Sequence, residues 1–176
     1  MPFKTQLLSF VLLLLTAAGH GEGRQVSAPR SPTTVACPVT TPNGIVAGGH
    51  EEDPSSYGNR QVSVGPFGLW PEGTVVFKPG GAGFVARDGS LGMKFGWQRG
   101  VPGQLRIEGR RLDAPASPLR VEVPHGYGAL GFQATYLIFP TPGCWEVTGR
   151  VGDASVTFVT RVVKIGEGPT WRRDVP

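Results

Sequence analysis

The sequence has few of the residues that usually signal a metal or catalytic centre. Its 176 residues include three histidines and two cysteines. His20, His50 and His125 show no H-x-x-x-H or similar spacing, and Cys37 and Cys144 each lack the neighbouring Cys or His that completes a pair of zinc ligands. The sequence therefore predicts no metal site and no cofactor.

Charge is scarce as well, and neither sign dominates. The chain has 17 Lys and Arg against 13 Asp and Glu, a net charge of +4. The longest run of one sign is Glu51-Glu52-Asp53. So mild a balance gives no electrostatic signature for a nucleic acid or an anionic membrane. We therefore expect no nucleic-acid partner.

One long apolar run is present, and it is too short to span a membrane. Leu7–Ala18 is uncharged over twelve residues, whereas a spanning helix needs about 20. Lys4 precedes it, and small residues at Ala17 and Gly19 suit the subsites of signal peptidase. We predict a signal peptide over residues 1–19, a secreted or extracytoplasmic protein, and no membrane span in the mature chain.

Two alternatives to this cleavage remain open. Cleavage after Ala18 or Gly21 would also follow small residues. The segment Thr34–Cys37 resembles a lipobox, in which a lipid is attached to the cysteine. In a lipoprotein signal, however, the cysteine directly follows the apolar run, and here residues 19–36 intervene.

The two cysteines are most simply paired with each other. Exported proteins fold in oxidising conditions, where a pair of thiols usually becomes a disulfide. Closing a loop of about a hundred residues would stabilise the fold by roughly 4 to 5 kcal/mol in the chain-entropy model. Such a bond between Cys37 and Cys144 would also attach the N-terminal arm to the domain. Two free buried thiols and an intermolecular bridge are the alternatives.

Composition divides the mature chain into three parts. Residues 20–56 are rich in Pro, Gly, Ser and Thr without apolar periodicity, which is typical of an extended, flexible leader, here anchored only at Cys37. Residues 57–168 alternate short apolar runs with Gly and Pro turns, as sandwiches and barrels do. Residues 169–176 form a tail.

The domain is predicted to be all-β, because its apolar runs have the period of strands and none has that of a helix. The expected strands are Gln61–Val64, Thr74–Lys78, Leu91–Trp97, Gln104–Arg110, Leu119–Val123, Phe132–Phe139, Cys144–Val151 and Ser155–Ile165. Several have one apolar and one polar face, as in antiparallel sheets packed face to face. We predict a single antiparallel β-sandwich of the immunoglobulin-like type; a closed barrel is the alternative.

The last two strands carry the most specific pattern. Gly152-Asp153 separates two alternating runs and is typical of a two-residue hairpin turn. This turn pairs Val151 with Ala154, and it pairs Val147 with Phe158. The apolar side chains then lie on one face of the ribbon.

The motifs that could indicate catalysis lack their structural context. Gly81–Ala86 matches a dinucleotide-binding pattern, but another turn follows where that motif needs a helix. Ser90 sits in Asp-Gly-Ser-Leu-Gly, which lacks the first glycine of a nucleophile elbow. A triad of Ser90, His125 and either Asp88 or Asp113 stays open, because triads assemble in space. We assign no catalytic residue.

Glu108, Glu122 and Glu146 are the acidic residues that fall within predicted strands. Each lies beside arginines on a predicted polar face. This placement is typical of solvated cross-strand ion pairs rather than of a pair of glycosidase carboxyls.

Aromatic residues in loops are the remaining candidates for binding. Gly and Pro flank the rings Tyr57, Trp70, Trp97 and Tyr127, together with Phe67. Exposed rings on a β-sandwich can stack on sugars or anchor a protein partner. The alternative is that they fill the ends of the core, as we expect for Trp145, which alternates with buried valines.

Four segments, Phe139–Val163 with its PGCWEVTGRVGDAS motif, DGSLGMKF, LRIEGRRLDAP and FQATYLIFP, resemble a group of uncharacterised exported bacterial proteins. The similarity covers most of the chain from Tyr57 onward. The Pro-Gly-Cys-Trp-Glu-Val segment and its hairpin also resemble the closing strands of bacterial immunoglobulin-like domains. The resemblance implies export and a β-sandwich, and it implies no activity.

These observations favour a non-enzymatic binding or structural module of the cell envelope or the medium. Its partner would be a glycan or an envelope protein. A small secreted hydrolase or hydrolase inhibitor is the alternative, and an accessory domain for a membrane-bound partner is a third class.

Overall fold

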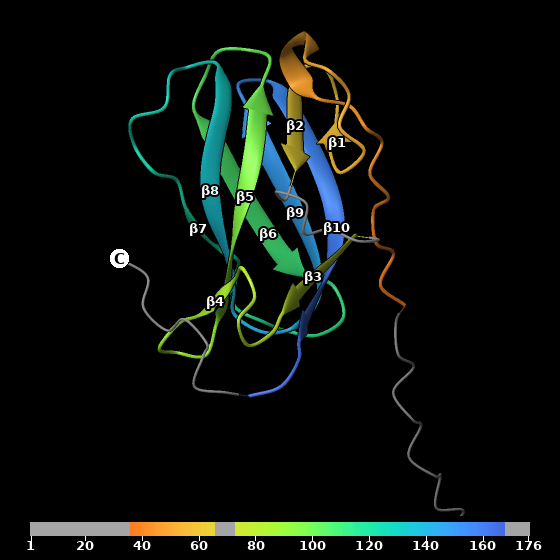
Figure 1. The fold of residues 1–176 in the computed structure, drawn as a ribbon, viewed down its shortest axis with the longest axis vertical. Helices are drawn as coiled ribbons and strands as arrows, with labels where there is room; N and C mark the ends of the chain where they lie inside the picture. Colours follow the sequence, from red (N-terminus) through yellow and green to blue (C-terminus); the bar gives the residue numbers. More distant parts are fainter. Residues whose placement is uncertain (1–35, 66–72, 168–176) are drawn as a thin grey trace, which may run out of the picture. The chain divides into compact units, whose positions relative to one another are not determined.

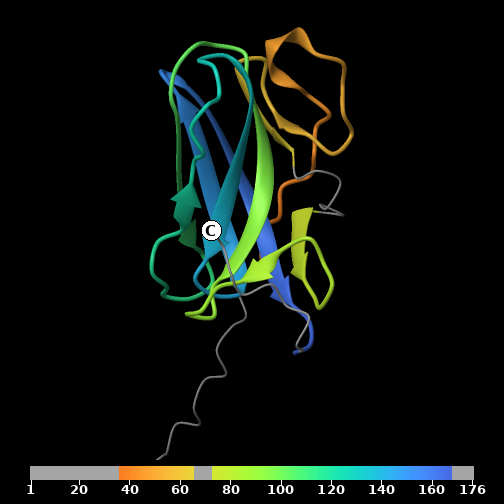
Figure 2. The same cartoon turned by 60° about the vertical axis from the view of Figure 1, so that its left-hand side comes forward.

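Residues 36–65 and 73–167, the part of the chain that the computed structural model describes, form a sandwich of two β-sheets (Figures 1 and 2). The first sheet has the order β1-β2-β5-β8-β7, with β4 also paired to β5, and the second has the order β3-β10-β9-β6. Only β3 and β10 pair in parallel among these strands. The predicted all-β sandwich is confirmed.

The eight predicted strands all overlap observed ones, and the two-residue strands β1 and β4 are additional. The bounds are β1 Tyr57–Gly58, β2 Val62–Gly65, β3 Thr74–Phe77, β4 Phe84–Val85, β5 Leu91–Arg99, β6 Leu105–Arg111, β7 Arg120–Glu122, β8 Gly131–Phe139, β9 Gly143–Val151 and β10 Ala154–Lys164. One 3-10 turn, η1, covers Ala47–Gly49.

The hairpin of β9 and β10 has the predicted register. Val151 pairs with Ala154, and Val147 pairs with Phe158. Gly152 in the turn has a φ of 56°, a conformation that glycine adopts without strain. The turn and the apolar pattern therefore select the same pairing, and that agreement made this element predictable.

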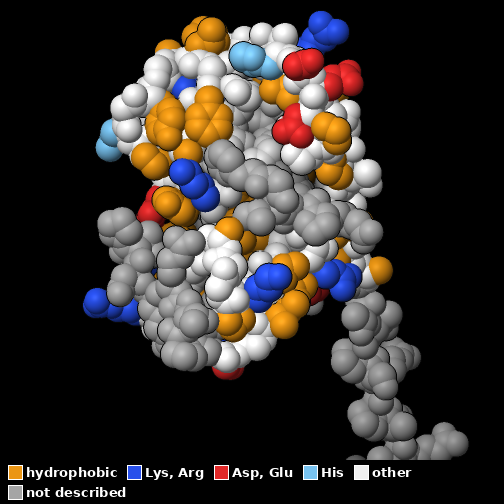
Figure 3. Space-filling view, in the orientation of Figure 1, with side chains coloured by type: hydrophobic (Ala, Val, Ile, Leu, Met, Phe, Trp, Pro, Cys, Tyr) orange, Lys and Arg blue, Asp and Glu red, His pale blue; other side chains and the backbone are white. Residues whose placement is uncertain are grey.

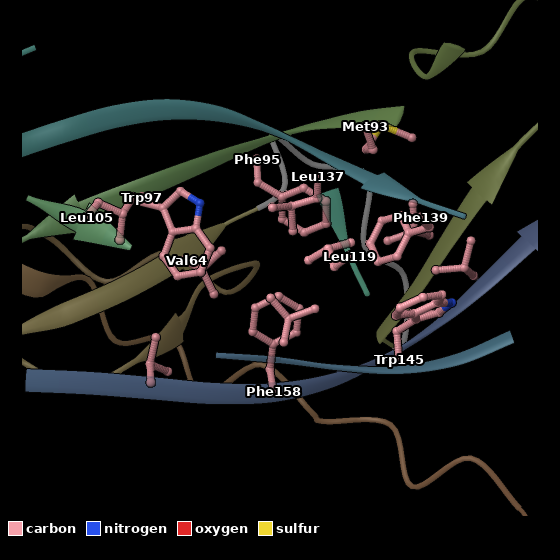
Figure 4. Packing of buried hydrophobic residues seen from close by; sticks show 14 of the residues in the cluster. Val64, Met93, Phe95, Trp97, Leu105, Leu119, Leu137, Phe139, Trp145 and Phe158 are labelled. Atoms are coloured by element: carbon pink, nitrogen blue, oxygen red, sulfur yellow. The ribbon is translucent and has the colours of Figure 1, made fainter. Parts of the chain in front are cut away.

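The core fills the space between the sheets, with a buried tryptophan at each end. Trp97 from the first sheet and Trp145 from the second lie at opposite ends of the packed side chains (Figure 4). Gly149 in β9 makes room for Trp97, because a Cβ there would lie 2.3 Å from the indole ring. Trp145 is a core residue, as predicted.

Cys37 and Cys144 form the predicted disulfide, with their Cα atoms 5.4 Å apart. Disulfides persist in oxidising compartments, so the bond indicates a protein that folds outside the reducing cytoplasm. Among the described residues, no helix has the length and apolar character needed to cross a membrane. The predicted signal peptide and the tail lie outside the described residues.

Residues 36–56 of the predicted leader, called the arm below, run beside the sandwich (Figure 1). They are held at more points than Cys37. The backbone of Thr40 donates to the carbonyl of Val159 in β10, and its hydroxyl accepts from the amide of Val159, both at 2.8 Å. Asn59, which lies between β1 and β2, donates to the carbonyl of Ser155 in β10 at 3.0 Å. These contacts give partners to backbone groups at the β10 edge, which would otherwise need water or another chain.

Candidate functional site

Trp97, one of the four rings proposed for binding, is inside the protein. Its exposed fraction is 0 %, and its indole Nε1 donates to the Thr135 hydroxyl at 3.0 Å. Side chains alternate along β5, and this position faces the second sheet, which explains the burial. Trp97 therefore matches the core alternative and is not available to stack on a ligand.

The other three proposed rings have different positions. Tyr57 is half-buried and packs against the core, whereas Trp70 lies outside the described residues, as does Phe67. Tyr127 is 39 % exposed. Of the described rings proposed from the sequence, Tyr127 is therefore the most accessible.

Tyr127 has an aromatic neighbour that the sequence analysis did not single out. Phe132 is 42 % exposed, and the two ring centroids lie 6.1 Å apart at an angle of 64°. Phe132 points outward from β8, and Tyr127 comes from the loop before it. Tyr127 and Phe132 form the aromatic patch, which lies among the hydrophobic side chains over the start of β8 in Figure 3.

A first recess lies on one side of this patch, between the outer face of the first sheet and the arm. Its volume is about 360 Å³, and it is lined by Val46, His50, Glu51, Asp53, Ser56, Ser63, Gly65, Gly96, Gln98 and Phe132. Figure 3 shows the histidine and acidic side chains gathered over this part of the arm. Gly65 and Gly96 pair across β2 and β5, and the missing side chains leave the floor hollow.

Two side chains of the first recess, Gln98 and Asp53, present hydrogen-bond acceptors. Gln98 Oε1 is buried without a hydrogen-bond partner, and a buried acceptor normally has one. The amide and hydroxyl of Ser55 donate to Asp53, at 2.9 and 2.8 Å, and lower the pKa of this carboxyl. Asp53 is therefore a carboxylate acceptor at neutral pH.

A second recess lies on the other side of the patch, at the end of the sandwich. Its volume is about 440 Å³, and it is lined by Arg99, Gly103, Gln104, Val123, Pro124, His125, Gly126, Tyr127, Gly128, Ala129 and Gln133. The loop between β7 and β8 supplies most of these residues. Arg99, the last residue of β5, is only 3 % exposed.

Arg99 holds the two loops that surround it. Its guanidinium donates to the carbonyls of Gly131 and Gly103, at 3.3 and 3.1 Å, and to that of Gly128. Burial lowers the pKa of Arg99. The side chain therefore positions the loop that carries Tyr127.

The opposite end of β5 carries a different polar cluster. The Ser90 hydroxyl donates to Asp88 at 2.6 Å, and Arg120 pairs with Asp88 at 2.7 Å and contacts the Ser90 oxygen. The Ser90 hydroxyl and amide, followed by Arg120, lower the pKa of Asp88 to about 2. Asp88 is therefore ionised and its oxygens are occupied.

The structure does not bring the open Ser90–His125 triad together. Ser90 precedes the first residue of β5, whereas His125 lines the recess at the last residue of β5. Nine residues of strand at about 3.3 Å each separate the two ends by about 30 Å. Asp113 instead pairs with Arg111 at 2.6 Å. Ser90 is a buried turn residue, as its local pattern favours.

Two of the three strand acids form the cross-strand ion pairs predicted for them, and none is found for Glu122 among the described residues. Glu146 pairs with Arg110 across the strands, and Glu108 pairs with Arg150. Gly81–Ala86 forms a loop and the short strand β4, with no helix after it. Within the described ranges, no group of three or more His, Cys, Asp or Glu residues is placed to hold a metal ion.

Two signals in the sequence could have pointed to the recesses. Arg99 follows Trp97 by two residues, so strand alternation places it on the same inward side. The other signal is the glycine pair Gly65 and Gly96, although their pairing follows only from knowing which strands are neighbours. The arm residues of the first recess had no periodic pattern and could not be assigned a position.

Comparison with known proteins found no matching family model, no matching curated protein and no matching solved structure.

Proposed function

We propose that this protein is an exported, non-enzymatic binding module whose ligand is a carbohydrate. The observation that carries the proposal is the exposed Tyr127–Phe132 ring pair, which stands between two recesses lined with polar side chains. Aromatic faces contact the apolar faces of sugars, while neighbouring amides and carboxylates bond the hydroxyls. Both kinds of group are present on this surface.

The polar groups of the first recess suit sugar hydroxyls. The unpartnered Gln98 Oε1 and the Asp53 carboxylate are acceptors, and a sugar hydroxyl can donate to either. Phe132 forms an apolar wall beside them. A sugar ring against Phe132 could therefore satisfy the buried acceptor that the protein leaves open.

The proposal includes an immunoglobulin-like fold. Lettered A to G in chain order, β2, β5, β6, β7, β8, β9 and β10 give one sheet of order A-B-E-D and another of order C-F-G, which is the order of a constant-type immunoglobulin domain. The disulfide departs from that type, because it joins the arm to β9 rather than one sheet to the other. The strand order supports the assignment despite this difference.

Export is supported by two independent observations. The disulfide indicates an oxidising compartment, and the run Leu7–Ala18 has the pattern of a signal peptide. A glycan of the cell envelope or the medium would be accessible to a protein in that location.

A glycan array tests the proposal. We expect the mature protein to bind a subset of glycans, and Phe132→Ala or Tyr127→Ala to weaken binding at least about tenfold, because each removes a stacking ring. Ile165→Ala is the matched control, since Ile165 is also exposed, at 54 %, and lies outside both recesses. Equal loss in all three variants, or no glycan bound at all, would overturn the proposal.

A further inference from the structure

Arg99 carries a buried positive charge that no carboxylate of the described residues neutralises. The ion pairs found there involve Arg110, Arg111, Arg120, Arg150 and Lys164, all of them more exposed. Removing a charge from water costs several kcal/mol unless a partner compensates for it. Arg99 is therefore the one arginine of the described chain that pairs burial with a missing counter-ion.

The three carbonyls around Arg99 orient its guanidinium without neutralising it. They accept three of its five N–H donors. The pKa of Arg99 is lowered by burial alone, as expected where no anion offsets the desolvation. The carbonyls hold the group in place without cancelling its charge, and Arg99 lines the second recess.

The second recess, which Arg99 lines, has the other groups that an acidic sugar needs. No acidic side chain lies among its described lining residues. Gln104 and His125 are exposed there, and neither side chain has a hydrogen-bond partner in the described structure. Tyr127, which belongs to the aromatic patch, forms one wall of this recess. The first recess, by contrast, carries Glu51 and Asp53, which would repel an anion.

We propose that the second recess binds the carboxylate of an acidic sugar, with Arg99 as the charge partner, Gln104 and His125 as hydrogen-bonding groups, and Tyr127 against the sugar ring. Arginine is well suited to this role because its planar guanidinium matches a carboxylate. This inference rests on the proposed carbohydrate-binding function and specifies the class of sugar.

The test is a titration of the full mature protein followed by backbone amide chemical shifts, which detect weak binding. The probes are D-glucuronate, D-glucose and acetate. Glucuronate has both a carboxylate and a sugar ring, glucose has only the ring, and acetate has only the carboxylate. We expect glucuronate to shift the amides of Gly103, Gly128 and Gly131 and to bind at least about tenfold more tightly than glucose or acetate.

A charge variant that leaves Arg99 in place keeps the test independent of folding. Gln104→Glu adds a negative charge at the exposed rim of the second recess, and we expect it to weaken glucuronate binding at least about tenfold. Ser117→Glu adds the same charge to an exposed position in the loop before β7, outside the recess, and should leave binding unchanged.

The outcomes separate this inference from the broader function. Equal affinity for glucuronate and glucose, or no effect of Gln104→Glu, would overturn the acidic-sugar inference while array binding through Phe132 still stands. Equal affinity for acetate and glucuronate would show that the ring contributes nothing, which also overturns it. If neither sugar shifts these amides and the array is blank, both proposals fail.

Discussion

Two arginines at opposite ends of the first sheet show how differently one protein treats the same charge. Arg120 lies at the surface, paired with Asp88 and Ser90. Arg99 lies inside, and the hydrogen bonds of its guanidinium within the described ranges all go to backbone carbonyls. The charged and hydrogen-bonding groups of the Arg120 cluster are paired with one another, so few of them are left to bind a ligand. The Arg99 end keeps a charge that no carboxylate of the described residues neutralises, beside a recess, which is why our proposal locates binding there.

The largest expected effect comes from removing the disulfide. Replacing Cys37 and Cys144 by alanine opens a loop with a sequence separation of 107 and should lower the free energy of unfolding by roughly 4 to 5 kcal/mol. Urea unfolding measures this loss.

The same variant distinguishes the two ends of the sheet. The freed arm forms a wall of the first recess, so hydrogen exchange should rise at the amides of Ala47 and Gly48, which bond to Ser63 and Arg60. The Ser90 amide, bonded to Asp88, should change less. Equal acceleration at both ends would show that the arm has no local role there.

The two arginines should differ in their contribution to stability. Arg99→Met leaves the carbonyls of Gly103, Gly128 and Gly131 without their donor. We expect this loss to outweigh the relief of the buried charge and to leave a net cost of about 2 to 4 kcal/mol. Arg120→Met removes a side chain that is 51 % exposed and should cost less than about 1 kcal/mol. Thermal unfolding of the two variants compares these costs. Similar values would mean that Arg99 does not hold its loops as the hydrogen bonds indicate.

The smallest expected effect concerns the stability in acid of the cluster formed by Asp88, Ser90 and Arg120. The pKa of Asp88 is lowered to about 2 from 3.8, so its ionised form stabilises the fold above pH 3.8, and this contribution is lost as the pH falls toward 2. Asp88→Asn should therefore be slightly less stable at neutral pH and should lose less stability than the wild type between pH 4 and 2. Urea unfolding over this range measures it. A steeper decline in the variant would contradict the pKa direction.

The predictability of each region followed from how local its pattern was. The β9–β10 register could be predicted because the Gly152-Asp153 turn and the apolar alternation agree within one hairpin. The Cys37–Cys144 pair could be predicted because the chain has only two cysteines and its N-terminal pattern predicted an oxidising compartment. The pattern around Trp97 fitted both an exposed ring in a loop and a buried ring in a strand, because Gly96 precedes it. The alternation of β5, when it is followed as far as Arg99, favours the buried position.

The recesses depended on relations that no local pattern carries. Gly65 and Gly96 form a hollow floor only because β2 lies beside β5, and Phe132 and Tyr127 meet only once the loop after β7 has folded back. The arm lacks periodicity because it is held by individual hydrogen bonds to Val159 of β10, to Arg60 and to Ser63. Sequence reasoning therefore identified Tyr127 without its surroundings.

The arm that covers β10 also implies an order of assembly. The arm precedes the sandwich in the chain, but the strand edge it covers and the cysteine it joins belong to the β9–β10 hairpin, which is synthesised later. The edge can therefore be covered only after both segments, whose cysteines are separated by 107 residues, have been synthesised and have met. An unpaired strand edge invites association with other chains. We therefore expect association with other chains to be favoured in the interval before Cys37 pairs with Cys144, and a reducing environment to prolong that interval.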